Sequence, residues 1–266
     1  MTIGKFLKTS TGNLQKAGIG SARLDTLILL EDTLHKDRSW LLAHLETELT
    51  SIQHKKLTKQ LGRRLKHEPL AYIRGFTEFY GRKYKINRQV LEPRPESETM
   101  IDILKALKLP NDAKITDVGT GSGAIGITAA LELHNHNVDL YDIDAGALAV
   151  AKHNCALHEL HLRVIKRDLL RNSHKPYDII LANLPYVPNN WRINEAAAME
   201  PRIAIFGGND GLDVYRRLFE QLSRFSWRPK YIFTEALPPQ HPQLVRISKL
   251  HGFKLRTKRD FIQVFQ

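Results

Sequence analysis

The sequence predicts an α/β protein: a doubly wound, mostly parallel sheet preceded by a small helical bundle and a linking β-hairpin. Two observations carry this prediction. Residues 1–75 show only helical apolar spacing, whereas from residue 114 onward short apolar runs alternate with helical patterns. We therefore expect three parts: a helical domain at 1–75, a hairpin at 76–92 and a sheet domain at 93–266.

The front bundle is predicted from the spacing of its leucines. Apolar residues at 24–34 recur at helical intervals. Thr50, followed three residues later by Gln53, is typical of a capping box at a helix start. Pro69 should stop the pattern that begins there, because proline does not continue a helix.

The segment after the bundle changes character. Aromatic and β-branched residues flank Gly81 in FTEFYGRKYKINRQVLE, which predicts a hairpin. The proline-punctuated joint PRPESE at 93–98 then precedes an amphipathic helix at 100–107.

The sheet domain is expected to alternate strands and helices. Helices should run through Leu133 and Leu157. The expected strands lie at 115–118, 138–141, 164–165, 177–182, 231–234 and 261–265.

Composition narrows the class of protein. With 42% hydrophobic and 26% charged residues, the 266-residue chain has an ordinary globular composition. No apolar run approaches the roughly 18 residues of a membrane helix, and the N-terminus lacks the apolar core of a signal peptide. We therefore expect no membrane contact. Cys155 is the only cysteine, so we also expect no disulfide within the chain and a cytoplasmic location.

The net charge of +12 is uneven, with +6 in residues 1–75. A basic face favours nucleic acid, a ribosome or an acidic protein as partner, although solubility alone would also explain it.

The first chemical motif is a glycine loop after the first expected strand. It reads Asp117-Val118-Gly119-Thr120-Gly121-Ser122-Gly123. Glycines let the backbone turn sharply and approach a ligand, and the following helix start offers free N–H groups. A tight strand-to-helix turn with no ligand is the simpler interpretation of this loop alone.

Acidic residues at the ends of the next two strands argue for a ligand. Asp142 lies 19 positions after Gly123, where a carboxylate can accept hydrogen bonds from a ribose; Asp144 could do the same. The spacing of the glycines is the one seen in S-adenosylmethionine sites. Asp168 and Leu169 are then placed to meet an adenine, although a helix cap is the commoner fate of such an aspartate.

The second motif is Asn183-Leu184-Pro185-Tyr186, after the apolar run at 179–182. The Asn183 side-chain oxygen and the Leu184 carbonyl can accept both N–H bonds of an amide or exocyclic amine. That arrangement would aim a poorly nucleophilic nitrogen at a methyl carbon. Pro185 would fix the turn, and Tyr186 would pack on the flat face of the substrate.

No metal is expected. His153, Cys155, His158 and His161 share a helical stretch, but no carboxylate or second cysteine completes a ligand set. Solvated helix residues are the better interpretation of this group.

Together these features resemble the PrmC/HemK family, S-adenosylmethionine-dependent methyltransferases that modify the glutamine amide of class-1 peptide release factors. The resemblance covers nearly the whole chain and rests on five stretches: ARLDTLILLEDTL, RRLKHEPLAYIRGFTEFYGRKYKI, LEPRPESE, DVGTGSGAIG and MEPRIAIFGGNDGLDVYRRL. It implies a Rossmann-like methyltransferase domain, a substrate-docking role for residues 1–75, and a monomer.

The resemblance also implies roles for single residues. The cofactor, S-adenosylmethionine, would be held by Asp117, Gly119, Thr120, Gly121, Ser122, Gly123, Asp142, Asp168, Leu169 and Asn183. The glutamine amide would be held by Asn183, Leu184, Pro185 and Tyr186, with Asn183, Pro185 and Tyr186 as the catalytic group.

Three departures from the family pattern keep rivals open. Leu184 stands where the family usually has proline, and Asn-Leu-Pro-Tyr is also the form seen in adenine-N6 methyltransferases that act on RNA or DNA. Glu235 runs into ALPPQ, where a glycine is usual, and the C-terminus KRDFIQVFQ is abbreviated. The rivals are therefore an adenine-N6 methyltransferase and a cofactor-binding protein that has lost catalysis.

Overall fold

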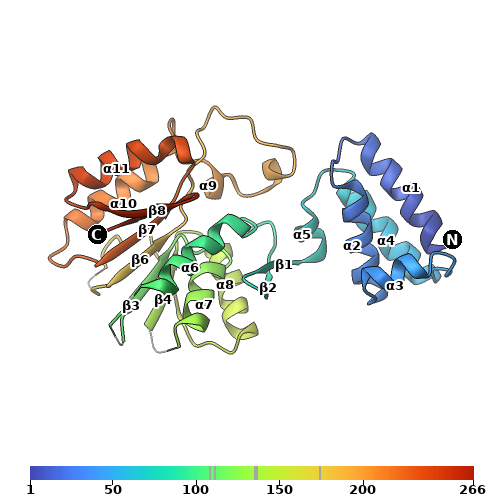
Figure 1. Cartoon of the computed structure of the whole chain (residues 1–266), viewed down its shortest axis with the longest axis horizontal. Coiled ribbons are helices and arrows are strands. Elements are labelled where there is room, and N and C mark those ends of the chain that lie inside the picture. Colours follow the sequence, from blue (N-terminus) through green and yellow to red (C-terminus); the bar gives the residue numbers. More distant parts are fainter. Residues whose placement is uncertain (108, 111, 135–136, 174) are drawn as a thin grey trace. The chain divides into compact units, whose positions relative to one another are not determined.

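A computed structural model describes residues 1–107, 109–110, 112–134, 137–173 and 175–266. The chain divides into two compact units (Figure 1). Unit 1 comprises Met1–Gly75 and Asn194–Met199, and unit 2 comprises Phe76–Ile193 and Glu200–Gln266.

Unit 1 is helical. Its main helices are α1 (Ile3–Lys16), α2 (Ala22–Leu34), α3 (Arg38–Ala43), α4 (Ser51–Arg64) and α5 (Leu70–Arg74). The expected capping box is present at the start of α4, where Gln53 N donates to Thr50 Oγ1 and Thr50 N donates to Gln53 Oε1. Pro69 does not stop α4, which ends earlier, before the left-handed turn at His67 (φ 61°); Pro69 instead caps α5.

Buried leucines, isoleucines and one phenylalanine from these helices form the core of unit 1. A buried ion pair crosses it, because Arg64 Nε donates to Asp25 Oδ2 at 2.7 Å. Arg64 also reaches the backbone oxygen of Glu68, so its buried charge is well partnered.

The hairpin has the expected place and turn. Strands β1 (Phe76–Phe79) and β2 (Arg82–Lys85) pair antiparallel. Tyr80 and Gly81 both have positive φ (51° and 72°), the conformation that a two-residue hairpin turn requires.

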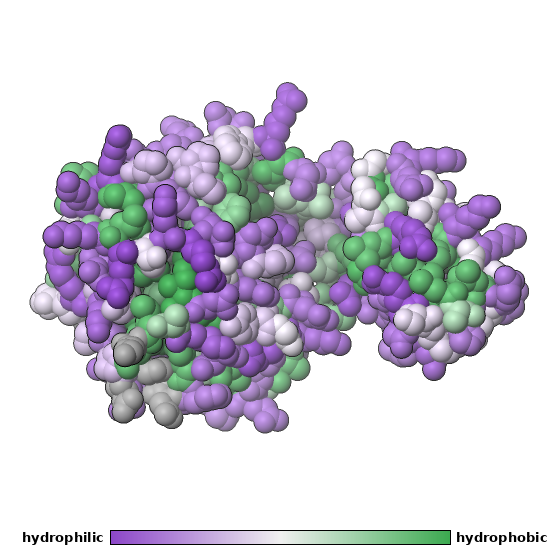
Figure 2. All heavy atoms as spheres, viewed as in Figure 1, coloured by the Kyte–Doolittle hydropathy of each residue, from purple (hydrophilic) through white to green (hydrophobic). Residues whose placement is uncertain are grey.

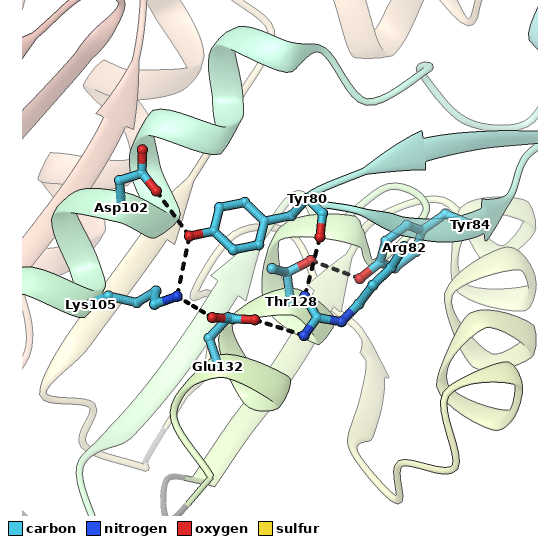
Figure 3. A network of polar contacts seen from close by, with 7 residues as sticks. All are labelled: Tyr80, Arg82, Tyr84, Asp102, Lys105, Thr128 and Glu132. Carbon is cyan, nitrogen blue, oxygen red and sulfur yellow. Dashed lines mark hydrogen bonds and ion pairs between the residues drawn. The ribbon is translucent and has the colours of Figure 1, made fainter.

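A polar network fastens this hairpin to the helices of unit 2 (Figure 3). Tyr80 OH donates to Asp102 Oδ1 at 2.9 Å, and Arg82 Nη2 donates to Glu132 Oε1 at 2.7 Å. Lys105 bonds to both Glu132 and the Tyr80 hydroxyl. The hairpin is thus built into unit 2 rather than standing apart as a linker.

One seven-stranded sheet, in the order β5-β4-β3-β6-β7-β9-β8, organises the described part of unit 2. All neighbours are parallel except those of β9, which runs antiparallel to β7 and β8. Its strands are β3 (Lys114–Val118), β4 (Asn137–Asp142), β5 (Arg163–Lys166), β6 (Ile179–Ala182), β7 (Tyr231–Glu235), β8 (Leu255–Arg259) and β9 (Ile262–Phe265).

Helices cover both faces of this sheet (Figure 1). One apolar core packs α6 (Glu98–Ala106), α7 (Ala124–Glu132) and α8 (Ala145–Leu157) against it. The other core packs α10 (Asp213–Ser223) and α11 (His241–Leu250) on the opposite face. The doubly wound, mostly parallel sheet and the preceding helical bundle are confirmed.

The sheet has one strand that the sequence did not predict. All five residues of β8 are exposed, so LRTKR carries no apolar alternation to reveal a strand. It pairs only with β9, at the edge, where lysine and arginine discourage pairing with another chain. Residues 255–265 therefore form an antiparallel hairpin of β8 and β9.

On the face shown in Figure 2, hydrophilic side chains cover much of each unit, and hydrophobic residues show between them. Within the described ranges, no helix is both long and apolar enough to cross a membrane.

Candidate active site

A cavity of about 230 Å³ opens at the carboxyl ends of β3, β4 and β6. This is the edge at which open α/β sheets bind ligands. The predicted residues on its wall are Gly119, Thr120, Gly121, Ser122, Asp142, Asp168, Leu169, Asn183, Leu184 and Pro185. Asp117, Gly123 and Tyr186 are not part of this wall.

The glycine loop is held through its backbone N–H groups, which bond to the end of β4. Gly119 N and Thr120 N both donate to Tyr141 O, at 2.8 and 2.9 Å, and Gly121 N donates to Asp142 Oδ2 at 2.8 Å. Gly119 and Gly121 have φ of 72° and 56°, which favour glycine. No described atom lies within 4 Å of the place a Gly121 Cβ would take, so this part of the backbone is open to a ligand.

Asp117 shapes the loop from beneath. Its side chain is fully buried, and Oδ2 accepts from Thr120 Oγ1 at 2.6 Å and from Gly126 N at 2.9 Å. Burial raises the pKa of Asp117 to about 6, although both hydrogen bonds oppose that shift. A Cβ on Gly126 would come within 2.8 Å of the Asp117 Cβ, so this side of the loop is closely packed.

Asp142 ends β4 facing the cavity. Its two oxygens accept from Gly121 N and Asp144 N, at 2.8 and 2.9 Å, and burial raises the pKa of this carboxyl group. Each oxygen keeps a further lone pair for a ribose hydroxyl. Asp144 is a helix cap, since its Oδ1 accepts from Ala147 N at the start of α8.

Asp168 and Leu169 also line the cavity, just after β5, the strand next to β4 in the sheet. Asp168 forms an ion pair with Arg217 of α10, in which Arg217 Nη2 donates to Asp168 Oδ1 at 2.6 Å. Leu169 has a positive φ of 53° and is buried. The Asp168 carboxylate, which the sequence places near an adenine, is therefore also the partner of Arg217.

The second motif follows β6 and faces the glycine loop. A Cβ on Gly119 would lie 2.8 Å from Leu184 Cδ2, so the Leu184 side chain packs directly against that loop. Asn183 Nδ2 donates to Ser97 Oγ at 3.0 Å, and Tyr186 OH donates to Glu235 Oε1 at 3.1 Å.

The loop of residues 207–211 and the end of ALPPQ hold this motif in place. Gln240 Nε2 donates to Tyr186 O and to Asp210 O, both at 2.8 Å. A Cβ on Gly211 (φ 80°) would lie 2.0 Å from Tyr186 O. The unusual ALPPQ sequence thus still supplies a glutamine that fixes the Tyr186 backbone.

Sequence reasoning missed part of the cavity wall. The further residues are Gln89, Val90, Leu91, Pro93, Ser97, Ala124, Ile125, Ile143, Ala147, Arg167, Ile203, Ala204, Phe206, Val214 and Arg217. Most of them are apolar. Several lie in the stretches that carry the family resemblance, but no local pattern there assigns them to a ligand site. Asp144, the alternative to Asp142, is also on this wall.

The predicted group His153, Cys155, His158 and His161 lies on α8 and just after it. In the described ranges, no three histidine, cysteine or acidic side chains gather as a metal-binding cluster. His158 Nε2 instead bonds to Lys83 O at 3.0 Å. The expectation of solvated side chains is wrong for Cys155, which is buried because it joins the core under α8, and burial raises the pKa of its thiol to about 11.

The cavity fits S-adenosylmethionine. Gly121 leaves open backbone, the Asp142 carboxylate can receive ribose hydroxyls, and the apolar wall suits a cation whose charge is lost in the reaction.

Comparisons with known proteins agree with this geometry. Residues 5–75 match the PrmC N-terminal domain, and residues 97–200 match the methyltransferase small domain. The hMettl16 catalytic domain, solved with MAT2A 3'UTR hairpin 1, has a TM-score of 0.56 at 13% identity, covering 91% of this chain and 89% of that one. A T. thermophilus 16S rRNA methyltransferase, solved with AdoMet and guanosine, has a TM-score of 0.51 at 16% identity, covering 71% and 48%. The fold and cavity define an S-adenosylmethionine-dependent methyltransferase.

Curated relatives identify the family within this class. A release factor glutamine methyltransferase of Clostridium botulinum is 34% identical over 96% of this chain and 93% of its own length. The chain belongs to the release factor glutamine methyltransferase family. A bifunctional methyltransferase of Rickettsia bellii is 33% identical over 95% of this chain but only 51% of its own length. The chain thus spans about half the length of such bifunctional relatives.

Proposed function

We propose that this protein methylates the side-chain amide N5 of glutamine in the Gly-Gly-Gln motif of class-1 peptide release factors. One observation carries the proposal: Asn183, Leu184 and Pro185 line the same cavity as the glycine loop and Asp142. An amide-holding motif and a cofactor-holding loop therefore share one space. Family membership supplies the choice of substrate.

The roles of the residues follow from amide chemistry. Bound S-adenosylmethionine supplies an activated methyl group. Asn183 Oδ1 and the Leu184 carbonyl accept the two N–H bonds of the glutamine amide and aim its nitrogen. Pro185 fixes the backbone between them, and the Tyr186 ring packs against the amide plane. One proton leaves the nitrogen on methylation, and it passes to solvent.

The cavity wall keeps water away from the reacting atoms. Leu169 and Leu184 are buried on this wall, and Phe206 stands with them. Without water, the hydrogen bonds made by Asn183 are stronger. An apolar wall also solvates the positive sulfonium of the cofactor poorly, which favours the transfer because that charge is lost in it.

Unit 1 is the part that we assign to docking the release factor. Lys55, Lys56 and Lys59 of α4 are exposed, and no catalytic motif lies in these helices. Reversing these three charges should raise KM for the release factor at least about fivefold at low salt, with kcat unchanged. An unchanged KM would place the docking surface elsewhere.

The decisive experiment offers labelled S-adenosylmethionine and the protein two substrates in parallel: an unmodified release factor and bulk ribosomal RNA. Mass spectrometry then locates the label, with Asn183→Ala as the inactive control. Label on the Gly-Gly-Gln glutamine supports the proposal. Label on adenine moves the protein to the adenine-N6 class, and cofactor binding without label supports a binding protein that has lost catalysis.

A basic surface motivates a second contact, with a ribosome or other nucleic acid. Residues 224–260 hold nine basic and two acidic residues, and one of the acidic pair, Glu235, is buried. Lys249, Lys254 and Lys258 are exposed there. We expect binding to RNA that weakens steeply with salt, and a weaker salt dependence when these lysines become glutamate.

We further propose that the protein acts as a monomer in the cytoplasm. The exposed, basic edge strand β8 disfavours edge-to-edge pairing, and a substrate of the translation machinery is met in that compartment. Light scattering over a range of protein concentrations tests the oligomeric state.

A further inference from the structure

A chain of hydrogen bonds runs from Asn183 into the protein interior. Asn183 Nδ2 donates to Ser97 Oγ at 3.0 Å, and Ser97 Oγ donates to Glu235 Oε2 at 2.6 Å. Tyr186 OH donates to the other oxygen of Glu235, at 3.1 Å. Ser97 and Glu235 are each only 1% exposed, so water does not compete for these bonds.

The direction of each bond follows from the charge at the end of the chain. A carboxylate has no proton to give, so Ser97 must donate its single hydroxyl proton to Glu235. Ser97 can then only accept from Asn183, which places the NH₂ group of Asn183 on Ser97. The Asn183 oxygen is left for the cavity.

This direction matters because the two ends of an asparagine amide have nearly the same shape. An amide turned the other way would present its own N–H groups to the N–H groups of the substrate. The two donors would repel, and the nitrogen would no longer be aimed at the methyl group.

We propose that Ser97 and Glu235 are positioning residues that fix the orientation of the Asn183 amide so that its oxygen accepts the substrate N–H. This inference rests on the proposed function, in which Asn183 holds the glutamine amide. The two residues act through Asn183 and touch no reacting atom.

The orientation of Asn183 is fixed only at pH values at which Glu235 is ionised. Burial raises the pKa of the Glu235 carboxyl group, and nearby Glu96 adds to that rise, whereas hydrogen bonds from Ser97, Tyr186 and the Asn183 side chain itself oppose it. The Tyr215 hydroxyl of α10 faces the Glu235 backbone. Once protonated, Glu235 can donate to Ser97, and the direction of the hydrogen bonds from Asn183 to Glu235 is no longer fixed.

The test compares variants on the unmodified release factor. Ser97→Ala and Glu235→Gln should each lower kcat about tenfold or more, because Asn183 loses its fixed orientation, while the cofactor Kd stays within about twofold. Ser97→Thr keeps the hydroxyl and should restore most of kcat. Ser248→Ala, which removes another buried hydroxyl, is the matched control and should keep full kcat.

Two readouts separate positioning from a merely structural role. In the wild type kcat should fall as pH drops through the Glu235 pKa, and Glu235→Gln should lack this acidic limb. The side-chain NH₂ protons of Asn183 should exchange slowly with solvent by NMR, and faster in Ser97→Ala.

The outcomes distinguish the two proposals. Full kcat in Ser97→Ala and Glu235→Gln, with an inactive Asn183→Ala, would overturn the positioning role and leave the proposed function intact. If the wild type leaves the release factor unmodified, the proposed function fails, and the NMR comparison still decides the orientation: unchanged exchange in Ser97→Ala overturns it.

Discussion

The two halves of the cavity are built by different means. On the β3 and β4 side, Gly119 and Thr120 bond to a strand carbonyl and Gly121 bonds to Asp142, so backbone groups shape the site. On the β6 and β7 side, the shape depends on side chains that reach one another across the chain, as Asn183 does to Ser97. In the cofactor half the groups held in place are backbone N–H groups of one short loop, whereas the substrate half depends on side chains that bond to one another.

This comparison predicts that damage to one half spares the other. Asn183→Ala should reduce turnover at least about 10³-fold, because the acceptor for the substrate N–H disappears from a preorganised site. The cofactor Kd should change less than about threefold. Single-turnover kinetics and calorimetric titration of S-adenosylmethionine measure the two effects, and turnover near that of the wild type would disprove the assigned role.

In the cofactor half, the buried Asp117 should make the free energy of unfolding depend on pH. The pKa of Asp117 is raised to about 6 from 3.8, so the folded state binds the extra proton between these values. The free energy of unfolding contributed by this group is therefore highest at low pH and falls as pH rises through 6. Relative to the wild type, Asp117→Asn should gain about 2 kcal/mol between pH 4 and pH 8.

Urea unfolding of both proteins at several pH values measures this difference, and other titrating groups cancel in it. A difference that does not change with pH would mean that Asp117 is ionised at no cost.

Tyr215 joins the ends of β6 and β7, so its loss should affect both stability and turnover. The hydroxyl shares its one proton between Glu235 O at 2.5 Å and Ala182 O at 3.0 Å. It accepts from Leu184 N at 3.3 Å and from Glu235 N at 3.2 Å. Tyr215→Phe leaves these buried groups without that partner and should cost about 1–3 kcal/mol.

The matched control for this variant is Tyr84→Phe, which removes a buried hydroxyl bonded to the Thr128 side chain. Neither Tyr84 nor Thr128 is part of the cavity wall. We expect kcat to fall in Tyr215→Phe but not in Tyr84→Phe. Equal kcat values would show that the hydroxyl only stabilises the fold.

The smallest effect is expected at the cavity rim. Arg217 and Asp168 form a half-exposed ion pair, and such pairs contribute at most about 1 kcal/mol. Arg217→Ala should therefore change the cofactor Kd less than about threefold. Asp168→Ala should weaken binding more if its carboxylate meets the adenine, and equal values for the two variants would contradict that contact.

The same division explains what the sequence could predict. The glycine loop was predictable because a backbone that bends at positive φ favours glycine, and Gly119, Gly121 and Gly123 stand at every second position of one short stretch. Asp142 was predictable because it ends the next strand. Ser97 and Glu235 lie 138 positions apart and look like an ordinary helix-start serine and strand-end glutamate. Nothing local indicates that they meet.

The fold shows the same limit at its edge. Strands β3, β6 and β7 are buried and apolar, and the sequence predicts them, whereas the five residues of β8 are exposed. Backbone pairing with β9 alone makes β8 a strand, and main-chain hydrogen bonds leave no trace in residue type.

Asn154 of α8 links the hairpin to the glycine loop. Its buried side chain accepts from Lys85 N at 2.8 Å and donates to Lys85 O at 2.9 Å and to Ser122 O at 2.8 Å. One amide therefore connects β2 to the glycine loop. In hydrogen–deuterium exchange, the Lys85 amide should act as a remote reporter: when a ligand stills the loop, deuterium uptake in the hairpin should slow with it.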